Sequence, residues 1–396
     1  MHKITQLDLF SGIGGFHLGF ERAGYEVKSY FSEIDKHAVA VYKQQFKDAE
    51  YVGSVTDVRG AELPTIDLIT FGSPCQDFSL AGKRKGMQGE RSSLVLEAIR
   101  LINECRPSVF IWENVKGTFS SNAGADFWAI IQAFANIGGY RLEWQLLNTS
   151  WVLPQNRERL YFVGYSTTPG GDWPGVFPIG EGYGESYKSK RETRSKIIDP
   201  NYLQRDFATY EEIAPCINAR MYKEPLIVKS ATSKGYEDIE IGDIRYDEGG
   251  FRPRKNGIAP ALVGSNSKSG TPNCSILKIK SATKKGYEEA QEGDSINLSQ
   301  PNSETRRGRV GKGKAQTLET SCNQAAVQDY RIRRLTPIEC ERLQGFPDNH
   351  TEYGNYDGEV KKMSNTQRYK QCGNAVTVDI VALVAEAVKP LLNRTV

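Results

Sequence analysis

Short apolar runs alternate with amphipathic stretches over the first 165 residues. Runs rich in β-branched and aromatic residues recur between stretches whose apolar positions have helical spacing, and this order is typical of a parallel α/β sheet. The predicted strands are Ile4–Phe10, Val27–Ser32, Ile66–Phe71, Val109–Trp112 and Arg159–Tyr165. The predicted helices are Gly15–Arg22, Ser92–Cys105 and Ala125–Asn136.

The pattern changes after Tyr165. Glycine, proline, serine, threonine and lysine predominate from there to about Asp329, among short strand-like pieces, which indicates a β-rich region. Helical spacing returns in Pro337–Gln344 and Thr377–Leu392. One catalytic domain with a β-rich insertion explains this order better than two domains in series. The expected segments are 1–178 and 366–396 for the catalytic domain, 179–365 for the inserted domain, and 331–365 at their junction.

A nonapeptide is repeated within the β-rich region. Lys229–Glu237 reads Lys-Ser-Ala-Thr-Ser-Lys-Gly-Tyr-Glu, and Lys280–Glu288 reads Lys-Ser-Ala-Thr-Lys-Lys-Gly-Tyr-Glu, at an offset of 280 − 229 = 51 residues. Two copies are too few for a solenoid, so the repeat predicts a duplicated β-unit.

Composition fits a soluble globular protein. The 396 residues exceed what one typical core supports, and 39% of them are hydrophobic and 25% charged. The N-terminus has no apolar run long enough for a signal peptide or a membrane span, so we expect a cytoplasmic protein. Seven scattered cysteines, an odd number without close pairs, argue against a disulfide framework and against a zinc site.

Charge changes this picture only locally. The net charge of +3 is too small to imply nucleic acid by itself. Arg306–Lys314, however, holds five cations and no acid, and Lys83–Lys85 is a second basic run. Either run taken alone is typical of a solvated loop.

The first candidate for chemistry is the glycine-rich stretch Phe10–Gly15, where a predicted strand meets a predicted helix and backbone can approach a ligand closely. His17 occupies the position of the third glycine in a dinucleotide fingerprint, which disfavours a nicotinamide enzyme. Glu33 ends the second strand, 33 − 12 = 21 residues after Gly12, where such folds place a carboxylate on ribose hydroxyls. We expect a nucleotide-like cofactor here.

The second candidate is Cys75, in the turn that follows the strand ending at Phe71. A cysteine is more often a small core residue than a nucleophile. Two features favour a nucleophile: the loop Ser79–Met87 is glycine-punctuated and basic, and Glu113 directly follows the next apolar strand. One edge of the sheet would then present a thiol and a carboxyl group.

The third candidate is the pair Arg157 and Arg159 in the segment Gln155–Arg159. Two residues at this spacing point the same way in an extended chain. They could bind phosphate, pair with Glu113, or form an ordinary surface ion pair.

In this order, these residues resemble the DNA cytosine-C5 methyltransferase family of bacteria and phages. The motifs that carry the resemblance are Phe10–Gly15, Pro74–Gln76, Glu113–Val115, Gln155–Arg159, Arg334–Cys340 and Gln371–Asn374. They cover roughly Leu7–Gly164 and Arg331–Val378. The resemblance implies a Rossmann-like, S-adenosylmethionine-dependent methyltransferase sheet with an inserted β-rich target-recognition domain.

The resemblance also implies a reaction. The family's cysteine attacks C6 of cytosine, its Glu-Asn-Val glutamate handles N3, and an arginine of Gln-x-Arg-x-Arg holds the cysteine and base. Those positions are Cys75, Glu113, Arg157 and Arg159. We therefore expect a DNA (cytosine-5-)-methyltransferase that transfers the methyl group of S-adenosylmethionine to C5 of a flipped cytosine in a specific double-stranded DNA sequence, through a covalent Cys75–C6 intermediate.

Other site residues follow from the same motifs. The cofactor-binding residues implied are Phe10, Gly12, Gly14, Glu33 and Asn374. Ile34 and Ser54 depart from the family pattern, because an aromatic residue and an acid often stand there to contact adenine. The DNA-binding residues implied are Gln76, Ser79, Lys83 and Arg84 in the loop after Cys75, with Thr317 and Leu318 matching a Thr-Leu dipeptide. The tetrapeptides 259–262 and 214–217 are similar, and Thr317 is preferred as the nearest upstream of Arg331.

The alternative functions differ from this one either in their substrate or in the class of protein. A branch of the same family acts on tRNA, although the long insertion favours duplex DNA. A catalytically silent DNA-binding protein is disfavoured by intact Pro-Cys-Gln and Glu-Asn-Val sequences, and a thiol hydrolase by the lack of a recognisable histidine partner motif. We expect a monomeric enzyme of a prokaryotic or phage-infected cytoplasm, without a metal, which a cognate restriction endonuclease could accompany.

Overall fold

The computed structural model describes residues 2–73, 93–167, 175–180, 239–245, 250–253, 275–300, 303–328 and 331–392. The chain forms two compact units. Unit 1 comprises Met1–Leu153, Arg157–Arg194 and Cys340–Val396, and unit 2 comprises Pro154–Asn156 and Ser195–Glu339. The chain therefore leaves unit 1 and returns to it, as an insertion requires.

Unit 1 is built on a seven-stranded sheet in the order β3-β2-β1-β4-β5-β8-β6. Its strands are β1 (His2–Leu9), β2 (Tyr25–Ser32), β3 (Glu50–Tyr51), β4 (Leu68–Gly72), β5 (Val109–Val115), β6 (Tyr140–Asn148) and β8 (Glu158–Ser166). The first five are parallel, as predicted, but β8 is antiparallel to both β5 and β6. The sheet is therefore mixed, because residues 149–157, which connect β6 to β8, contain no crossover α-helix.

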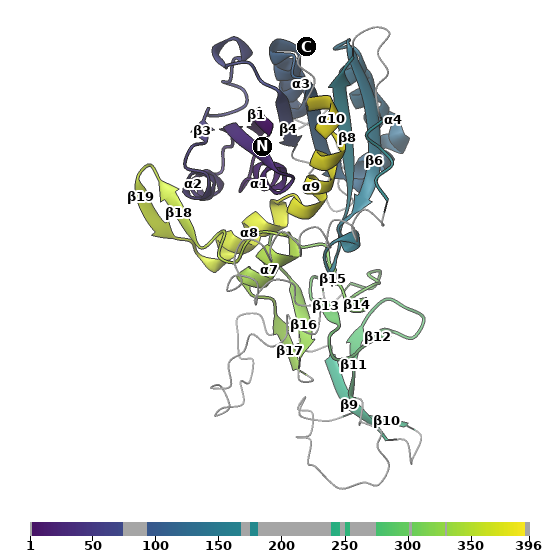
Figure 1. Ribbon diagram of the computed structural model, residues 1–396. Coiled ribbons are helices and arrows are strands. Elements are labelled where there is room, and N and C mark those ends of the chain that lie inside the picture. The colour runs from purple at the N-terminus through teal and green to yellow at the C-terminus, as the bar shows by residue number, and fades with distance from the viewer. Residues whose placement is uncertain are drawn as a thin grey trace. The chain divides into compact units, whose positions relative to one another are not determined.

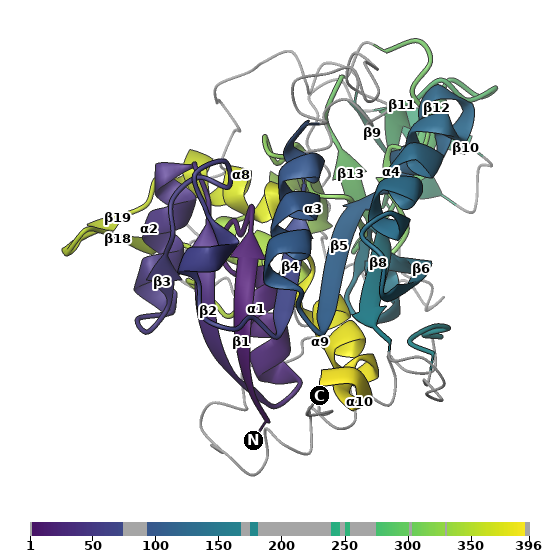
Figure 2. The same ribbon diagram turned by 90° about the horizontal axis from the view of Figure 1, so that it is seen from above.

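Some helices of unit 1 follow its parallel strands, and others form the C-terminal end of the chain. They are α1 (Gly15–Arg22), α2 (Lys36–Gln45), α3 (Ser93–Cys105), α4 (Ala125–Ala135), α8 (Asn365–Asn374), α9 (Val378–Ala387) and α10 (Lys389–Leu392), while α7 (Pro337–Leu343) spans the return from unit 2. A hairpin of β18 (Tyr353–Tyr356) and β19 (Glu359–Lys362) precedes α8. Figures 1 and 2 show these elements, and Figure 2 shows α3 in front of the sheet.

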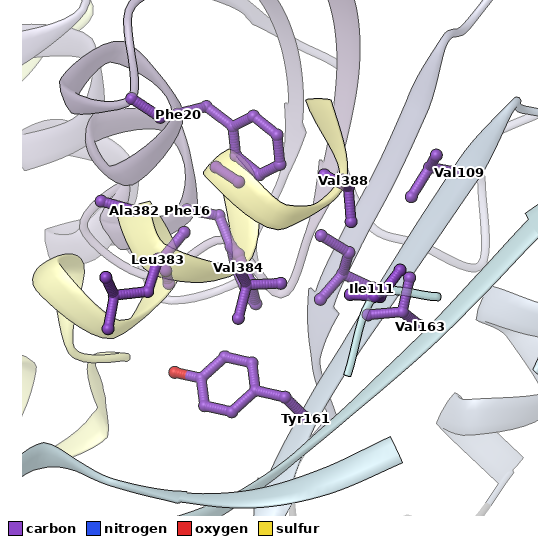
Figure 3. Close-up of a cluster of buried hydrophobic side chains, with 14 of the residues drawn as sticks. Phe16, Phe20, Val109, Ile111, Tyr161, Val163, Ala382, Leu383, Val384 and Val388 are labelled. Carbon is purple, nitrogen blue, oxygen red and sulfur yellow. The ribbon is translucent and has the colours of Figure 1, made fainter. Parts of the chain in front are cut away.

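Alternate residues of each strand point to opposite faces of the sheet, and each face has its own core. Val109 and Ile111 of β5 join a cluster that includes residues of α1 and α9 (Figure 3). Phe110 and Trp112 of the same strand join a second cluster that includes residues of α3 and α4. Helices thus cover both faces of the sheet, so a ligand site is expected at the ends of the strands.

Unit 2 holds short antiparallel strands in two four-stranded sheets. One has the order β10-β9-β11-β12 and the other β14-β13-β16-β17. The bounds are β9 (Ile239–Arg245), β10 (Gly250–Pro253), β11 (Ser275–Lys280), β12 (Tyr287–Ala290), β13 (Ser295–Asn297), β14 (Val310–Gly311), β16 (Gln324–Gln328) and β17 (Arg331–Arg334). A parallel pair joins β7 (Gln155–Asn156) to β15 (Ala315–Gln316). The β-rich character predicted for this region is confirmed.

Two features are absent from the described residues. None of the helices in these ranges is long and apolar enough to cross a membrane. Within the same ranges, no group of three or more histidine, cysteine, aspartate or glutamate side chains could hold a metal ion.

Candidate active site

The glycine-rich turn after β1 has left-handed backbone at three positions. Phe10, Gly12 and Gly14 have φ angles of 51°, 55° and 84°. Glycine adopts such angles without a side-chain penalty, whereas Phe10 is an uncommon non-glycine case. A Cβ atom on Gly12 would meet nothing within 4 Å, so this side of the turn is open. The side-chain hydroxyl of Ser11 is buried and has no hydrogen-bond partner.

Glu33, at the end of β2, turns its carboxylate toward this turn. Its Oε2 accepts a hydrogen bond from the backbone N–H of Gly12 at 3.0 Å. Its Oε1 accepts from the N–H groups of Ile34 and Asp35 at 2.8 and 2.9 Å. Three backbone donors therefore fix an anionic group beside the open side of Gly12, as the 21-residue spacing predicted for the positions of Gly12 and Glu33.

Two residues from the C-terminal part of unit 1 support the turn, and no sequence pattern predicted either of them. Nε2 of His350 donates to the carbonyl oxygen of Ile13 at 2.9 Å, and burial lowers the pKa of this histidine to about 4. Val376 packs so closely that a Cβ on Gly15 would lie 2.6 Å from its Cγ2. Neither contact has a local sequence signal, because more than 300 residues separate the partners.

Glu113 lies at the C-terminal end of β5 and is buried. The Nε atom of Arg159 approaches its Oε1 to 3.1 Å, although the N–H does not point at that oxygen, so the contact is mainly electrostatic. The strand register places Gly72 of β4 directly beside Glu113. A Cβ on Gly72 would lie 3.3 Å from Oε2 of Glu113 and 3.9 Å from Val376, so the carboxyl group and the support of the glycine-rich turn are close neighbours.

The chain beyond Gly72 is tied to β5 through Ser73. Its buried hydroxyl oxygen accepts from Nε1 of Trp112 at 2.9 Å and from Nδ2 of Asn114 at 3.4 Å. Trp112 and Asn114, which flank Glu113, thus hold Ser73 in place, and Ser73 is the last described residue before Cys75. Cys75 itself and the loop residues Gln76, Ser79, Lys83 and Arg84 lie outside the described residues.

Arg157 and Arg159 have different partners. Arg157 is buried and donates to the carbonyl oxygens of Ala375 at 2.8 Å and Gly373 at 3.5 Å. Burial, with a contribution from Arg159, lowers the pKa of Arg157 to about 9, which leaves it charged at neutral pH. The Arg157 side chain thus holds both neighbours of Asn374, which is exposed at the end of α8. Of the alternatives left open by sequence, Arg159 pairs with Glu113.

Two positions depart from the family pattern for adenine contact, and one of them, Ile34, lies beside the glycine-rich turn. Ile34 directly follows Glu33 and is 80% exposed. Oγ of Ser54 is 2.9 Å from Oγ1 of Thr56. An exposed isoleucine provides an apolar surface but no aromatic ring.

Thr317 and Leu318 lie in unit 2, where they contact the segment just before Arg157. Oγ1 of Thr317 donates to the carbonyl oxygen of Asn156 at 2.8 Å. The N–H of Leu318 donates to Oε1 of Gln155 at 3.0 Å. Together with the β7–β15 pairing, these bonds join the Thr-Leu dipeptide to the first two residues of the Gln155–Arg159 motif.

Comparisons with known proteins agree with this geometry. The profile of the C-5 cytosine-specific DNA methylase family matches residues 4–390. The chain is 30% identical to the type II methyltransferase M.BanI of Aneurinibacillus aneurinilyticus, over 97% of this chain and 95% of that protein. It is 29% identical to the orphan methyltransferase M.SPRI of Bacillus phage SPR, over 100% and 99%.

Solved structures show the same fold. A DNA modification methyltransferase encoded within an Escherichia coli prophage is similar with a TM-score of 0.54 and 21% identity, over 99% of this chain and 100% of that chain. The Entamoeba histolytica methyltransferase EhMeth is similar with a TM-score of 0.54 and 14% identity, over 100% of both chains. The expected methyltransferase sheet with an inserted region is confirmed. With a family profile that spans nearly its whole length, the chain belongs to the C-5 cytosine-specific DNA methylase family and is a DNA cytosine-5 methyltransferase that acts on DNA with a methyl donor.

Proposed function

We propose that the enzyme transfers the methyl group of S-adenosylmethionine to C5 of a cytosine that is flipped out of a specific double-stranded DNA sequence. The observation that carries this proposal is the buried Glu113, which Arg159 holds beside Gly72 at the end of β4, three residues before Cys75 in the sequence. In this family's reaction, a thiol and a carboxyl group must act on one pyrimidine ring.

The residues around the glycine-rich turn fit S-adenosylmethionine. Gly12 leaves one side of the turn open, the buried hydroxyl of Ser11 has no partner, and the carboxylate of Glu33 is fixed beside them. In this proposal Glu33 binds the ribose hydroxyls, and Phe10, Gly14 and Asn374 contact the rest of the cofactor. When bound, the cofactor supplies an electrophilic methyl group on a sulfonium centre.

Protein side chains make the target carbon reactive. The thiolate of Cys75 forms a bond to C6 while Glu113 gives a proton to N3, so that C5 becomes an enamine carbon. C5 takes the methyl group and then loses its proton to a base. The C6–S bond breaks, the thiolate leaves, and the proton on N3 returns to Glu113. Arg159 holds the carboxyl group in place, and Arg157 holds the backbone beside Asn374.

The target base lies inside a duplex, so the enzyme must extrude it at a cost of a few kcal/mol. We propose that Gln76, Ser79, Lys83 and Arg84 contact DNA from the loop after Cys75. Thr317, held against Asn156, would then contact DNA beside the flipped base, whereas Leu318, which is only 2% exposed and bonded to Gln155, would support it from the interior. The division into catalytic and target-recognition domains stays a prediction, as do a monomeric state and a cognate restriction endonuclease.

A methyl-transfer assay tests the proposal. Tritiated methyl groups from S-adenosylmethionine should appear in duplex DNA and not in tRNA, and labelling of tRNA alone would contradict it. Cys75→Ser should abolish transfer while DNA binding persists. Duplex DNA with 5-fluorocytosine should trap a covalent complex with the unaltered enzyme and none with Cys75→Ser, because fluorine at C5 prevents the final elimination.

A further inference from the structure

Ile34, which follows Glu33, contributes little packing to its own stretch of backbone. Its side chain is 80% exposed, at a position where an aromatic ring often stands in the family. Apolar surface stabilises a fold only to the extent that it leaves water, so this side chain adds little. The position of the Glu33–Ile34 peptide is therefore set by other contacts.

Both polar groups of the Glu33–Ile34 peptide are hydrogen-bonded. Its carbonyl oxygen, which belongs to Glu33, accepts from the hydroxyl of Tyr51 at 3.0 Å. Its N–H, which belongs to Ile34, donates to Oε1 of the Glu33 carboxylate at 2.8 Å. Of these two bonds, the one from Tyr51 ties the peptide to another strand.

Tyr51 belongs to β3, the two-residue strand at the edge of the central sheet. The strand register pairs it with Phe31 of β2, and the N–H of Val52 donates to the carbonyl oxygen of Phe31 at 3.0 Å. Paired residues of neighbouring strands point to the same face of a sheet. The ring of Tyr51 accordingly lies beside that of Phe31, with the centroids 5.3 Å apart. These contacts fix the ring from which the hydroxyl donates to Glu33.

Lys43 contacts the same ring. Its Nζ lies over the ring of Tyr51, 5.0 Å from the centroid, where a cation is attracted by the electrons of the ring face. This Nζ also pairs with Asp357, in the turn between β18 and β19, at 2.6 Å. Figure 1 shows this hairpin beside α2, the helix that contains Lys43. The ring of Tyr51, although 40% exposed, is thus held by Phe31 and by Lys43.

The carboxylate of Glu33 depends on this peptide for its direction. Its oxygens accept from the backbone N–H groups of Gly12, Ile34 and Asp35. Two of these three donors belong to the two residues that follow Glu33. A shift of the Glu33–Ile34 peptide would therefore move two donors at once and turn the carboxylate away from Gly12.

Space for a ligand is present after β3 as well as in the glycine-rich turn. Gly53, two residues after Tyr51, has a φ of 84°, and Gly12 has a φ of 55°. A Cβ on either glycine would meet nothing within 4 Å. Because β1, β2 and β3 are parallel, the residues that follow them lie at one edge of the sheet. Tyr51 thus stands beside the proposed cofactor site, one strand beyond Glu33.

We infer that Tyr51 is a positioning residue of the cofactor site. Its hydroxyl holds the Glu33–Ile34 peptide, so that the Glu33 carboxylate keeps the direction in which it binds the ribose hydroxyls. Because this role takes S-adenosylmethionine as the cofactor, it rests on the proposed function. It gives the weakly packed Ile34 an anchor in β3 in place of an aromatic ring of its own.

Calorimetry with S-adenosylhomocysteine tests this role on the full-length protein. Tyr51→Phe removes the hydroxyl and keeps the ring, and should weaken binding about 3-fold to 10-fold, the usual contribution of one hydrogen bond. The KM for S-adenosylmethionine should rise by a similar factor, with a smaller change in kcat, because Tyr51 acts on the cofactor through Glu33. In a Glu33→Ala background, Tyr51→Phe should weaken binding no further, since the carboxylate that it positions is gone.

Tyr140→Phe is the matched control. The hydroxyl of Tyr140 likewise donates to a carbonyl oxygen, that of Pro107, at 2.7 Å. The guanidinium of Arg106 lies over its ring, 5.0 Å from the centroid. Tyr140 begins β6, however, at the opposite edge of the sheet from β3. Loss of this hydroxyl should leave the affinity for S-adenosylhomocysteine unchanged.

Equal affinities of Tyr51→Phe and the unaltered protein would overturn the assignment of Tyr51. So would an equal loss with and without Glu33, or a similar loss in Tyr140→Phe. KM values supply the comparison where Glu33→Ala binds too weakly for calorimetry. If thermal unfolding shows that Tyr51→Phe does not fold, Lys43→Met replaces it, with an expected loss of about 2-fold, and unchanged affinity then overturns the assignment.

Failure of the proposed function would look different. In that case the unaltered protein itself would not bind S-adenosylhomocysteine, or would methylate tRNA alone. A normal affinity of the unaltered protein together with a normal affinity of Tyr51→Phe would remove Tyr51 from the site and leave the proposed function standing.

Discussion

Arg159 and Glu113 come from two antiparallel neighbours in the central sheet, and their side chains approach to 3.1 Å. Both side chains are largely buried, at 16% and 11% exposure. Burial makes the pair costly to break from one side only, because a lone buried charge remains. The pair therefore positions the carboxyl group rather than adding surface charge.

Loss of either partner should lower the rate of methyl transfer. Glu113→Gln removes the proton donor for N3, and we expect kcat to fall about 100-fold to 10,000-fold, the usual contribution of a general acid. Arg159→Ala should lower kcat less, because it leaves the carboxyl group present but unheld. Single-turnover transfer to duplex DNA measures both, with Arg159→Lys as the variant that keeps the charge. Equal activity of Glu113→Gln and the unaltered enzyme would contradict the assignment.

Gly12→Ala should weaken cofactor binding. A Cβ at this position points into open space beside Glu33, where the proposed cofactor lies, and the φ of 55° adds strain of about 1 kcal/mol. Gly138→Ala is the matched control, because Gly138 has a φ of 69° and equal open space but lies between α4 and β6. Calorimetry with S-adenosylhomocysteine should show about 10-fold weaker binding for Gly12→Ala only. Similar affinities in the two variants would remove Gly12 from the site.

Asp8→Asn should stabilise the fold at alkaline pH. Asp8 is buried in β1, accepts hydrogen bonds from Thr70 at 2.8 Å and Tyr42 at 3.3 Å, and burial raises its pKa from 3.8 to about 8. The unfolded chain therefore loses this proton first, and stability falls as pH rises from about 4 to about 8. At pH 8 the cost is on the order of a few kcal/mol.

Thermal unfolding across that range measures the effect. Asn keeps an oxygen for Thr70 and offers an N–H to Tyr42, so the variant should unfold at higher temperature than the unaltered protein at pH 8. Near pH 4 the two proteins should be alike. A variant less stable than the unaltered protein at pH 8 would show that Asp8 is ionised and stabilising.

His350→Gln should remove an acid-sensitive element behind the glycine-rich turn. Burial lowers the pKa of His350 from 6.5 to about 4, so the unfolded chain takes up a proton first as pH falls. Stability is therefore lost between about pH 6.5 and pH 4, up to about 3 kcal/mol. Glutamine retains a donor for the carbonyl oxygen of Ile13 and does not titrate. Urea unfolding at pH 5 and at pH 7.5 should show a smaller difference in the variant; an equal difference would exclude His350 as the cause.

Local sequence patterns determined much of the central sheet. The predicted strand Val109–Trp112 lies within β5, Ile66–Phe71 overlaps β4, and the predicted helix Gly15–Arg22 is α1. Alternation and helical spacing are properties of adjacent residues, so they can be read without the fold. The edge strand β6 was not predicted, although Tyr140–Leu146 alternates apolar and polar residues as a half-buried strand does.

Sequence alone also indicated that Glu33 serves the glycine-rich turn and that Cys75 and Glu113 follow neighbouring strands. Only the tertiary structure decided the partners of the two arginines. Arg157 and Arg159 are two positions apart, yet Arg157 lies just before β8 and contacts the end of α8, whereas Arg159 lies in β8 beside Glu113. Strand pairing and long-range packing set these contacts, and neither depends on spacing along the chain. The packing of Val376 on the glycine-rich turn was hidden for the same reason, since folding alone brings residues from opposite ends of the chain together.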